Sequence, residues 1–186
     1  MIDRLATPHQ RRAYGRGGIN RVTSPWRANT VPYASIMLGS LLPIWILADV
    51  MPVAPPLGYM IFLCWRVMRP GLMPLWVGVP LGAFDDLFSG QPFGSAIFLW
   101  SITMIALELI ETRFPWRGFW QDWFTAGLAM ILYVISAMVV SGASVTEHLV
   151  VAAVPQMIFC VLLYPLFARL IAWLDKFRLS RSRRIG

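Results

Sequence analysis

The sequence predicts an all-α integral membrane protein with six transmembrane helices and both termini in the cytoplasm. Of its 186 residues, 58% are hydrophobic and only 13% are charged. A soluble core of this size cannot bury so much apolar surface, so lipid must solvate part of it. All 16 Lys and Arg residues fall in four places, the two termini and two short connections. Six spans put all four places on one side of the membrane, as the positive-inside rule requires.

The N-terminal segment is polar and basic and contains turn-forming Gly and Pro, which predicts a mostly disordered cytoplasmic tail over 1–30. Arg11 and Arg12 are adjacent, as in a twin-arginine export signal, but the apolar sequence begins only near Val31, with no convincing cleavage site. We therefore expect the first span to be retained. It opens a six-helix transmembrane domain over 31–175, which a second basic cytoplasmic tail follows over 176–186.

Short polar or Pro- and Gly-containing breaks separate six apolar segments, at 31–50, 56–69, 71–87, 92–111, 122–142 and 147–174. The second and third are shorter than the roughly 20 residues that a bilayer core requires. A single re-entrant hairpin over 56–87 is therefore an alternative to two spans. Pro155 and Pro165 fall inside the last segment and predict a bend there.

The outer turns of the six-span arrangement, near 51–55, 88–91 and 143–146, contain no Lys or Arg. Tryptophan, whose amphipathic ring prefers the headgroup level, occurs near the expected cytoplasmic ends of the spans. These residues are Trp26, Trp116, Trp120, Trp123 and Trp173. Both patterns favour a cytoplasmic N-terminus.

Charged side chains in apolar segments are costly in lipid, so they mark positions where function is worth seeking. Glu108 and Glu111 lie on one face at the inner end of the fourth segment. Arg66 is expected to be shallow and to extend to the inner headgroups. These three residues are candidates for an intramembrane polar network, and the Glu pair is alternatively a contact for a partner's basic helix. Asp49 and Glu147 are interpreted as solvated residues of the outer interface.

The sequence has no signature of catalysis or metal binding: HExxH and GxSxG are absent, and its two His residues are His9, in the tail, and His148. Cys64 and Cys160 are isolated in apolar segments and are expected to be buried packing residues. We expect no enzymatic activity, cofactor or metal. The basic residues flank apolar spans, which favours attraction to anionic membrane lipids and disfavours nucleic acid as a partner.

Residues 82–94, Gly-Ala-Phe-Asp-Asp-Leu-Phe-Ser-Gly-Gln-Pro-Phe-Gly, join the third and fourth segments on the outer side. Asp86 and Ser89 can hydrogen-bond to the backbone groups that are left without partners where the third helix ends. Gly90 suits a positive φ, and Pro92 suits the first turn of the next helix. Gly94 is expected to leave room for close helix approach. Asp85 and Asp86 are adjacent and should point to different sides of their helix.

This segment resembles the rod shape-determining protein MreD family, in which an aspartate precedes one or two apolar residues and a Ser-Gly-x-Pro-apolar-Gly turn. The residues that match, and that are candidates for binding a partner, are Asp86, Ser89, Gly90, Pro92 and Gly94. Asp85 is an addition to the pattern. Span number, length and charge layout extend the resemblance over most of 31–175, whereas the tail before Val31 departs from the compact family pattern.

The resemblance implies a non-enzymatic scaffold in the bacterial inner membrane. Such a scaffold binds the bitopic protein MreC and, through it, MreB filaments, the glycosyltransferase RodA and a class B penicillin-binding transpeptidase. Together these proteins direct lateral peptidoglycan synthesis and rod shape. On this interpretation Gly39-Ser40 and the segment 78–82, with Gly at both ends, offer close-approach surface to the partner's membrane helix.

The family is also similar in fold to the S-components of energy-coupling-factor vitamin transporters, which supplies an alternative function. A solute-binding subunit would enclose a vitamin-sized molecule in an outward-facing pocket. Candidate polar groups for such a pocket are Asp49, Asp86, Gln91, Glu147 and His148. An S-component couples to its energising module through an alanine-rich helix face, and the first segment has no clear Ala-x-x-x-Ala repeat. This difference favours the scaffold.

Overall fold

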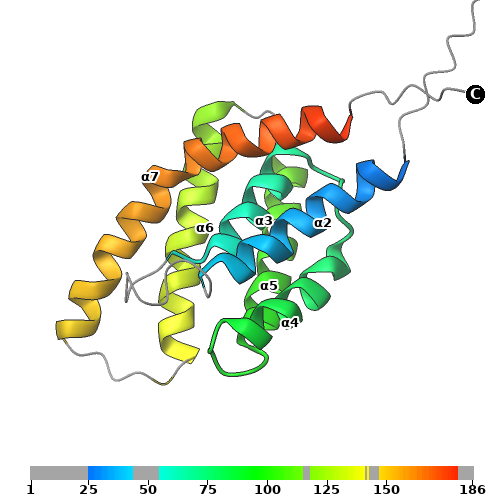
Figure 1. The fold of residues 1–186 in the computed structure, drawn as a ribbon. Coiled ribbons are helices and arrows are strands. Elements are labelled where there is room, and N and C mark those ends of the chain that lie inside the picture. Colours follow the sequence, from blue (N-terminus) through cyan, green and yellow to red (C-terminus); the bar gives the residue numbers. More distant parts are fainter. Residues whose placement is uncertain (1–24, 44–54, 115–117, 141, 143–146, 180–186) are drawn as a thin grey trace, which may run out of the picture.

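The computed structural model describes residues 25–43, 55–114, 118–140, 142 and 147–179, and these ranges contain helices and no strand. The helices are α2 (Pro25–Leu42), α3 (Leu57–Met68), the 3-10 helix η2 (Leu75–Val77), α4 (Gly78–Phe88), α5 (Ser95–Arg113), α6 (Phe119–Val140) and α7 (Glu147–Arg178) (Figure 1). The all-α prediction is confirmed for this part of the chain. Three stretches are long and apolar enough to cross a membrane, Ser95–Arg113, Phe119–Val140 and Ala153–Arg178.

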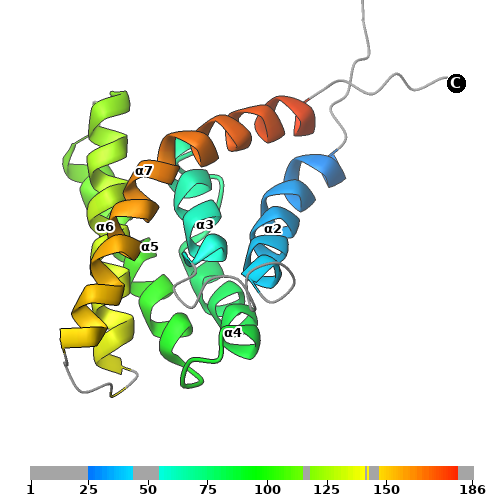
Figure 2. The same cartoon turned by 60° about the vertical axis from the view of Figure 1, so that its left-hand side comes forward.

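Successive α-helices run in opposite directions, so the start of α2 and the end of α7 lie at the same end of the bundle (Figures 1 and 2). A hydrogen bond joins these two helices there, from Nη1 of Arg178 to the carbonyl oxygen of Ala28 at 2.9 Å. We call this the basic end, because α3, α5 and α7 also finish there with Arg66, Arg113 and Arg178. The opposite end, where α4 turns into α5, is called the turn end.

Several helix boundaries differ from the sequence-based expectation. α4 begins at Gly78, after the 3-10 helix η2, where a segment from 71 was expected, and α6 begins at Phe119 where 122 was expected. α2 begins at Pro25, inside the expected tail, because proline suits the first turn of a helix. α7 continues to Arg178, beyond the expected limit at 175, and Asp175 pairs there with Arg178 at 2.8 Å. α5 begins three residues after position 92, because Gly94 has a φ of 100°. The remainders of both expected tails, 1–24 and 180–186, lie outside the described residues.

α3 and α4 are short helices of 12 and 11 residues. At 1.5 Å per residue each is less than about 20 Å long, whereas a bilayer core is about 30 Å thick. α3 lies nearer the basic end and α4 nearer the turn end, and residues 69–77 descend between them (Figures 1 and 2). The pair together reaches from one end of the bundle to the other, but neither helix has the length of a full span.

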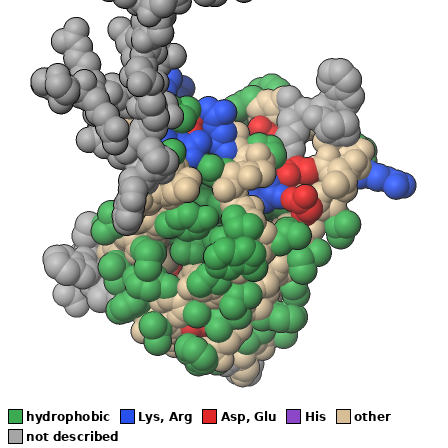
Figure 3. All heavy atoms as spheres, turned by 90° about the vertical axis from the view of Figure 1, so that its right-hand side faces the viewer, with side chains coloured by type: hydrophobic (Ala, Val, Ile, Leu, Met, Phe, Trp, Pro, Cys, Tyr) green, Lys and Arg blue, Asp and Glu red, His purple; other side chains and the backbone are tan. Residues whose placement is uncertain are grey.

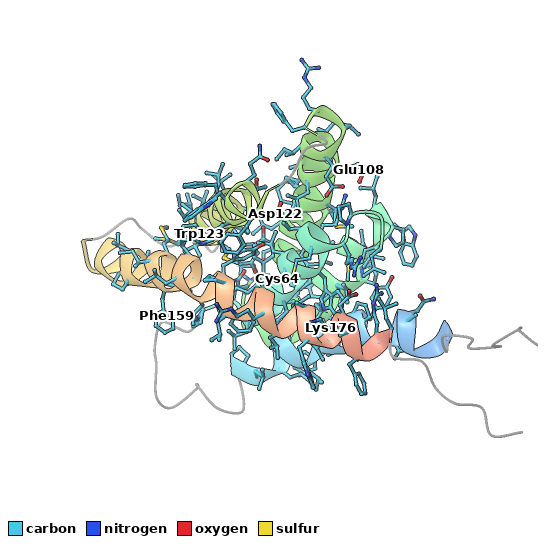
Figure 4. The ribbon with its side chains drawn as sticks, turned by 90° about the horizontal axis from the view of Figure 1, so that it is seen from above. Cys64, Glu108, Asp122, Trp123, Phe159 and Lys176 are labelled. Carbon is cyan, nitrogen blue, oxygen red and sulfur yellow. The ribbon has the colours of Figure 1, made fainter. Side chains whose placement is uncertain are left out.

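α3 is the central helix, with every residue from Gly58 to Val67 buried. Its sequence is apolar on all sides apart from Arg66, as expected for a helix enclosed by others. α2, α5, α6 and α7 pack around it, and from above Cys64 lies near the middle of the bundle (Figure 4). Cys64 and Cys160 are both buried and free, so the prediction that they are packing residues is confirmed.

Large apolar side chains cover much of the face seen in Figure 3, and others are exposed along the long helices. On α5 and α6 they recur every three or four residues, at Phe98, Ile102, Ile105 and Leu109 and at Phe124, Leu128, Leu132, Ile135 and Val139. Soluble monomers rarely expose apolar surface on this scale. The bundle is therefore apolar both inside and outside. α7, with two internal prolines, bends along its length (Figure 2).

The glycines expected to offer surface to a partner are instead used in packing within the chain. A Cβ on Gly82 would lie 2.7 Å from the backbone of Ala96 and Ile97, and a Cβ on Gly78 would lie 3.0 Å from the backbone of Ser101. Gly39 faces α3 in the same way, because a Cβ on Gly39 would lie 3.2 Å from the Cα of Gly58. The expectation of a glycine surface for MreC is therefore wrong at these positions, because neighbouring helices of the same chain already occupy it.

Candidate functional site

The turn between α4 and α5 is organised around the carboxylate of Asp86. The backbone N–H groups of Gly94 and Ala96 donate to it at 2.8 Å each, and that of Ile97 donates at 3.2 Å. The hydroxyl of Ser95 lies 3.1 Å from the same carboxylate and 3.2 Å from Oε1 of Gln91. The first N–H groups of a helix have no partner within the helix, and its N-terminus favours negative charge. Asp86 thus caps α5 from the preceding helix.

Two glycines of the turn adopt positive φ angles, 68° at Gly90 and 100° at Gly94. The prediction for Gly90 is confirmed. The expected role of Gly94 is wrong, because a Cβ there would meet no atom within 4 Å, so this glycine supplies a backbone conformation and not close approach. Pro92 precedes α5 and its carbonyl oxygen accepts from the N–H of Ser95 at 3.1 Å. Ser89 follows the last residue of α4, and its N–H donates to the backbone carbonyl oxygen of Asp85 at 2.8 Å.

The five motif residues are thus brought together in one turn, but they differ in accessibility. Asp86 is buried and bonded to its own chain, so it shapes the turn and does not present itself to a partner. Ser89, Gly90 and Pro92 are exposed. Phe93, which the sequence analysis did not select, is 72% exposed. The outward-facing surface of the motif therefore consists of small residues beside one large aromatic ring.

Asp85 points away from Asp86, as expected for adjacent helical residues, and is also buried. The side chain of Asp85 points toward Gly58 on α3 and Ser40 on α2. A Cβ on Gly58 would lie 3.1 Å from Oδ1 of Asp85 and would also meet the Oγ of Ser40. Ser40 and Trp100 are also buried. The sequence reasoning assigned Asp85 no role. The available signal was a second carboxylate on the other side of an apolar helix.

A second site lies at the basic end, where α3 meets α5. Arg66 is only 1% exposed, and its Nη1 donates to both carboxylate oxygens of Glu111, at 2.7 and 2.8 Å. Its Nη2 donates to Glu108, which is 46% exposed. The structure thus brings together the three residues proposed for a polar network. Arg66 does not extend to the headgroups as expected, because both carboxylates meet it inside the bundle.

A neighbouring group of charges connects α3 with α7. Asp175 accepts from Arg69 and from Nε of Arg178, the latter at 2.8 Å. The guanidinium of Arg178 lies 5.5 Å from the centroid of the Trp65 ring, within the range of a cation–π contact. Sequence reasoning missed this group because it assigned Arg178 to a solvated tail. The signal was Asp175, an isolated acidic residue in a basic stretch.

The remaining candidates for solute binding are less well placed. Asp49 lies outside the described residues, and Glu147 and His148 form the start of α7 without a description of their side chains. Within the described ranges, no group of three or more His, Cys, Asp or Glu side chains is arranged to hold a metal ion.

A scan against protein-family models and searches of curated proteins and of solved structures find no match to this chain. The observations above define the protein as a helical bundle with helices long enough to cross a membrane, a capped turn at one end and buried ion pairs at the other.

Proposed function

We propose that the chain is a non-enzymatic, multi-pass scaffold of the bacterial inner membrane, of the MreD type. It binds MreC and helps direct lateral peptidoglycan synthesis and rod shape as part of the cell-elongation machinery. The observation that carries the proposal is the turn of residues 86–94. Its motif residues form one unit, in which a buried aspartate caps the next helix and two glycines adopt positive φ.

The membrane part of the proposal is supported by the exposed apolar stripes of α5, α6 and α7 and by the basic end. With the basic end in the cytoplasm, α2 to α7 make six passes, and α3 and α4 are the two short ones. The turn end then faces the periplasm, where it is accessible to the extracytoplasmic base of a bitopic partner. A fold similar to that of S-components, which the resemblance implies, is part of the same proposal.

The test is affinity purification of the tagged protein from its native membrane in mild detergent, with mass spectrometry of retained proteins and small molecules. We expect MreC together with RodA and a class B penicillin-binding transpeptidase. Recovery of an ATPase pair with a bound vitamin would instead establish the solute-binding alternative and overturn the scaffold.

A matched pair of variants makes the result specific to the turn. Phe93 and Phe124 are exposed to similar extents, 72% and 69%, but lie on the turn and on α6. We expect Phe93→Ser to reduce MreC recovery several-fold and Phe124→Ser to leave it unchanged. Equal recovery with both variants would remove the turn from the interface.

A further inference from the structure

α7 is longer than a bilayer core is thick. Its 32 residues extend about 48 Å at 1.5 Å per residue, whereas the core is about 30 Å thick. With the start of α7 at the outer surface, as in the proposed orientation, about 18 Å of helix remains beyond the core at the basic end. This excess corresponds to about 12 residues, which is close to the part of α7 that follows Pro165.

A bend near Pro165 changes the direction of α7. Pro165 has no N–H, so it leaves the carbonyl oxygen of Val161 without its usual donor within the helix. Nε1 of Trp123 on α6 donates to that oxygen at 3.0 Å. Before the bend α7 runs beside α6, and after it the helix crosses past α3 to the start of α2 (Figure 2). Seen from above, the part that carries Lys176 lies lengthwise across the bundle (Figure 4). We call residues 166–178 the α7 arm.

One face of the α7 arm is fixed to the bundle. Ile171, Asp175 and Arg178 recur at helical spacing, and all three are buried. Asp175 accepts from Nε of Arg69 on α3 at 2.9 Å, and Arg178 donates to the carbonyl oxygen of Ala28 on α2 at 2.9 Å. These contacts hold the arm across the ends of two helices, so it does not project straight out of the bundle.

The opposite face of the arm is exposed and combines apolar with basic side chains. A row of apolar side chains, each between 44% and 62% exposed, consists of Leu166, Leu170, Trp173 and Phe177. Arg169 and Lys176 lie seven residues apart along one flank of this row and are also exposed. Within the part of the chain that the structure describes, neither cation makes a hydrogen bond or an ion pair.

A face of this kind matches the headgroup level of a membrane. Helices with an apolar row and flanking cations lie in the plane of the interface, and tryptophan prefers the same depth. The rings of Trp173 and Phe177 are stacked with centroids 6.1 Å apart, so they present one broad apolar surface to acyl chains. Arg169 and Lys176 then lie beside the lipid phosphates. An anionic phosphate diester supplies the oxygen acceptors that cations bind most strongly.

We propose that the α7 arm lies in the plane of the cytoplasmic leaflet and binds anionic phospholipid headgroups through Arg169 and Lys176. The inference rests on the proposed function only for the side on which the basic end lies, and it requires no MreC. An acidic segment of a protein would also pair with the two cations. It would leave the apolar row uncovered, although that row continues the exposed side chain of Leu162 before the bend.

The depth of the arm is measured by electron paramagnetic resonance of nitroxide labels on full-length protein in vesicles of phosphatidylcholine and phosphatidylglycerol. Single cysteines replace Leu170 or Phe177 on the arm, and Leu128 or Ile135 on α6 as a matched pair with the same spacing and similar exposure. We expect the first two labels at one depth, at the headgroups, and the α6 labels about 10 Å apart in depth. A difference of about 10 Å between positions 170 and 177 would make α7 a straight span and overturn the proposal.

The headgroup site is tested by native mass spectrometry of the same protein in mild detergent, titrated with phosphatidylglycerol or with phosphatidylcholine of the same acyl chains. We expect tighter binding of phosphatidylglycerol, by about fivefold for each of the two cations. Arg169→Gln and Lys176→Gln should each remove about one such factor. Arg113→Gln, at an exposed position at the end of α5, should leave the preference unchanged. Equal binding of the two lipids, or an equal loss with Arg113→Gln, would exclude the site.

Both measurements are made without a protein partner, so their failure is distinct from that of the proposed function. If MreC co-purifies from the native membrane but positions 170 and 177 differ in depth as the α6 pair does, the arm is wrong and the scaffold stands. If MreC does not co-purify while the two depths agree and phosphatidylglycerol is preferred, the scaffold fails and the lipid site stands.

Discussion

Asp86 shows how one side chain makes a turn rigid. Its carboxylate is buried and accepts from three backbone N–H groups at the start of α5. We expect Asp86→Ala to lower the free energy of unfolding by about 2–3 kcal/mol, since it leaves buried donors without a charged acceptor. Asp86→Asn retains one acceptor oxygen and should lose less.

Thermal unfolding in detergent, followed by tryptophan fluorescence, would measure these changes. Ser89→Ala, at an exposed position of the same turn, is the control and should stay within about 0.5 kcal/mol. If Asp86→Ala were as stable as this control, Asp86 would not be the cap of α5.

Arg66 poses the opposite problem, since it is a buried cation that depends on its partners. We expect Arg66→Met to cost about 3–5 kcal/mol, because it leaves Glu111 partly buried opposite an apolar side chain. Adding Glu111→Gln to this variant should recover part of the loss. Denaturant titration of the two single variants and the double variant gives their coupling energy, with exposed Arg113→Met as the control. Purely additive effects would contradict the pairing.

At these sites the sequence predicts residue types better than residue partners. Opposite charges in apolar segments must find each other, which is why Arg66 and the Glu pair could be grouped in advance. The cap by Asp86 was expected at the end of its own helix, but its partners lie eight to eleven residues later, across a turn of unknown shape. The link from Arg178 to Ala28 joins distant parts of the chain and leaves no local signal.

At the scale of helices, glycine determines how closely α4 and α5 approach. A Cβ at Gly82 would lie 2.7 Å from backbone atoms that no side-chain rotation can move. We expect Gly82→Ala to destabilise the protein by about 1–3 kcal/mol. Gly127 on α6 is the matched control, because its Cβ would meet only side-chain atoms of Val161, at 3.5 Å.

Gly127→Ala should be neutral, or stabilising by up to about 1 kcal/mol, since alanine is the better helix former. Thermal unfolding of the two variants side by side measures the difference. Equal stabilities would mean that α4 and α5 can separate without cost.

The extent of each helix was harder to anticipate than its existence. Residues 71–77 are as apolar as a span. Pro70 and Pro74, however, favour extended backbone at the residue that precedes each proline, and a hydropathy pattern does not detect this conformation.

At the scale of the whole molecule, the alternating helices and the basic end are the basis of the proposed orientation. If α2 to α7 make six passes, Asn29, Pro70 and Thr112 lie in the cytoplasm and Ser89 lies in the periplasm. All four residues are exposed, whereas Cys64 and Cys160 are buried and should react little. Single cysteine substitutions at the four positions therefore report their sides through a membrane-impermeant maleimide.

We expect Ser89→Cys to be labelled in intact spheroplasts and the other three only after permeabilisation. Pro70→Cys carries the decisive information, because Pro70 lies just after α3, and α3 and α4 are each too short for an ordinary span. Labelling of this position from the cytoplasm requires α3 and α4 to be two passes through a locally thin or partner-covered region. Labelling from the periplasm, or from neither side while Asn29 and Thr112 react inside, would make 56–87 a re-entrant hairpin. The irregular segment would then lie within the membrane, where lipid cannot satisfy its polar groups.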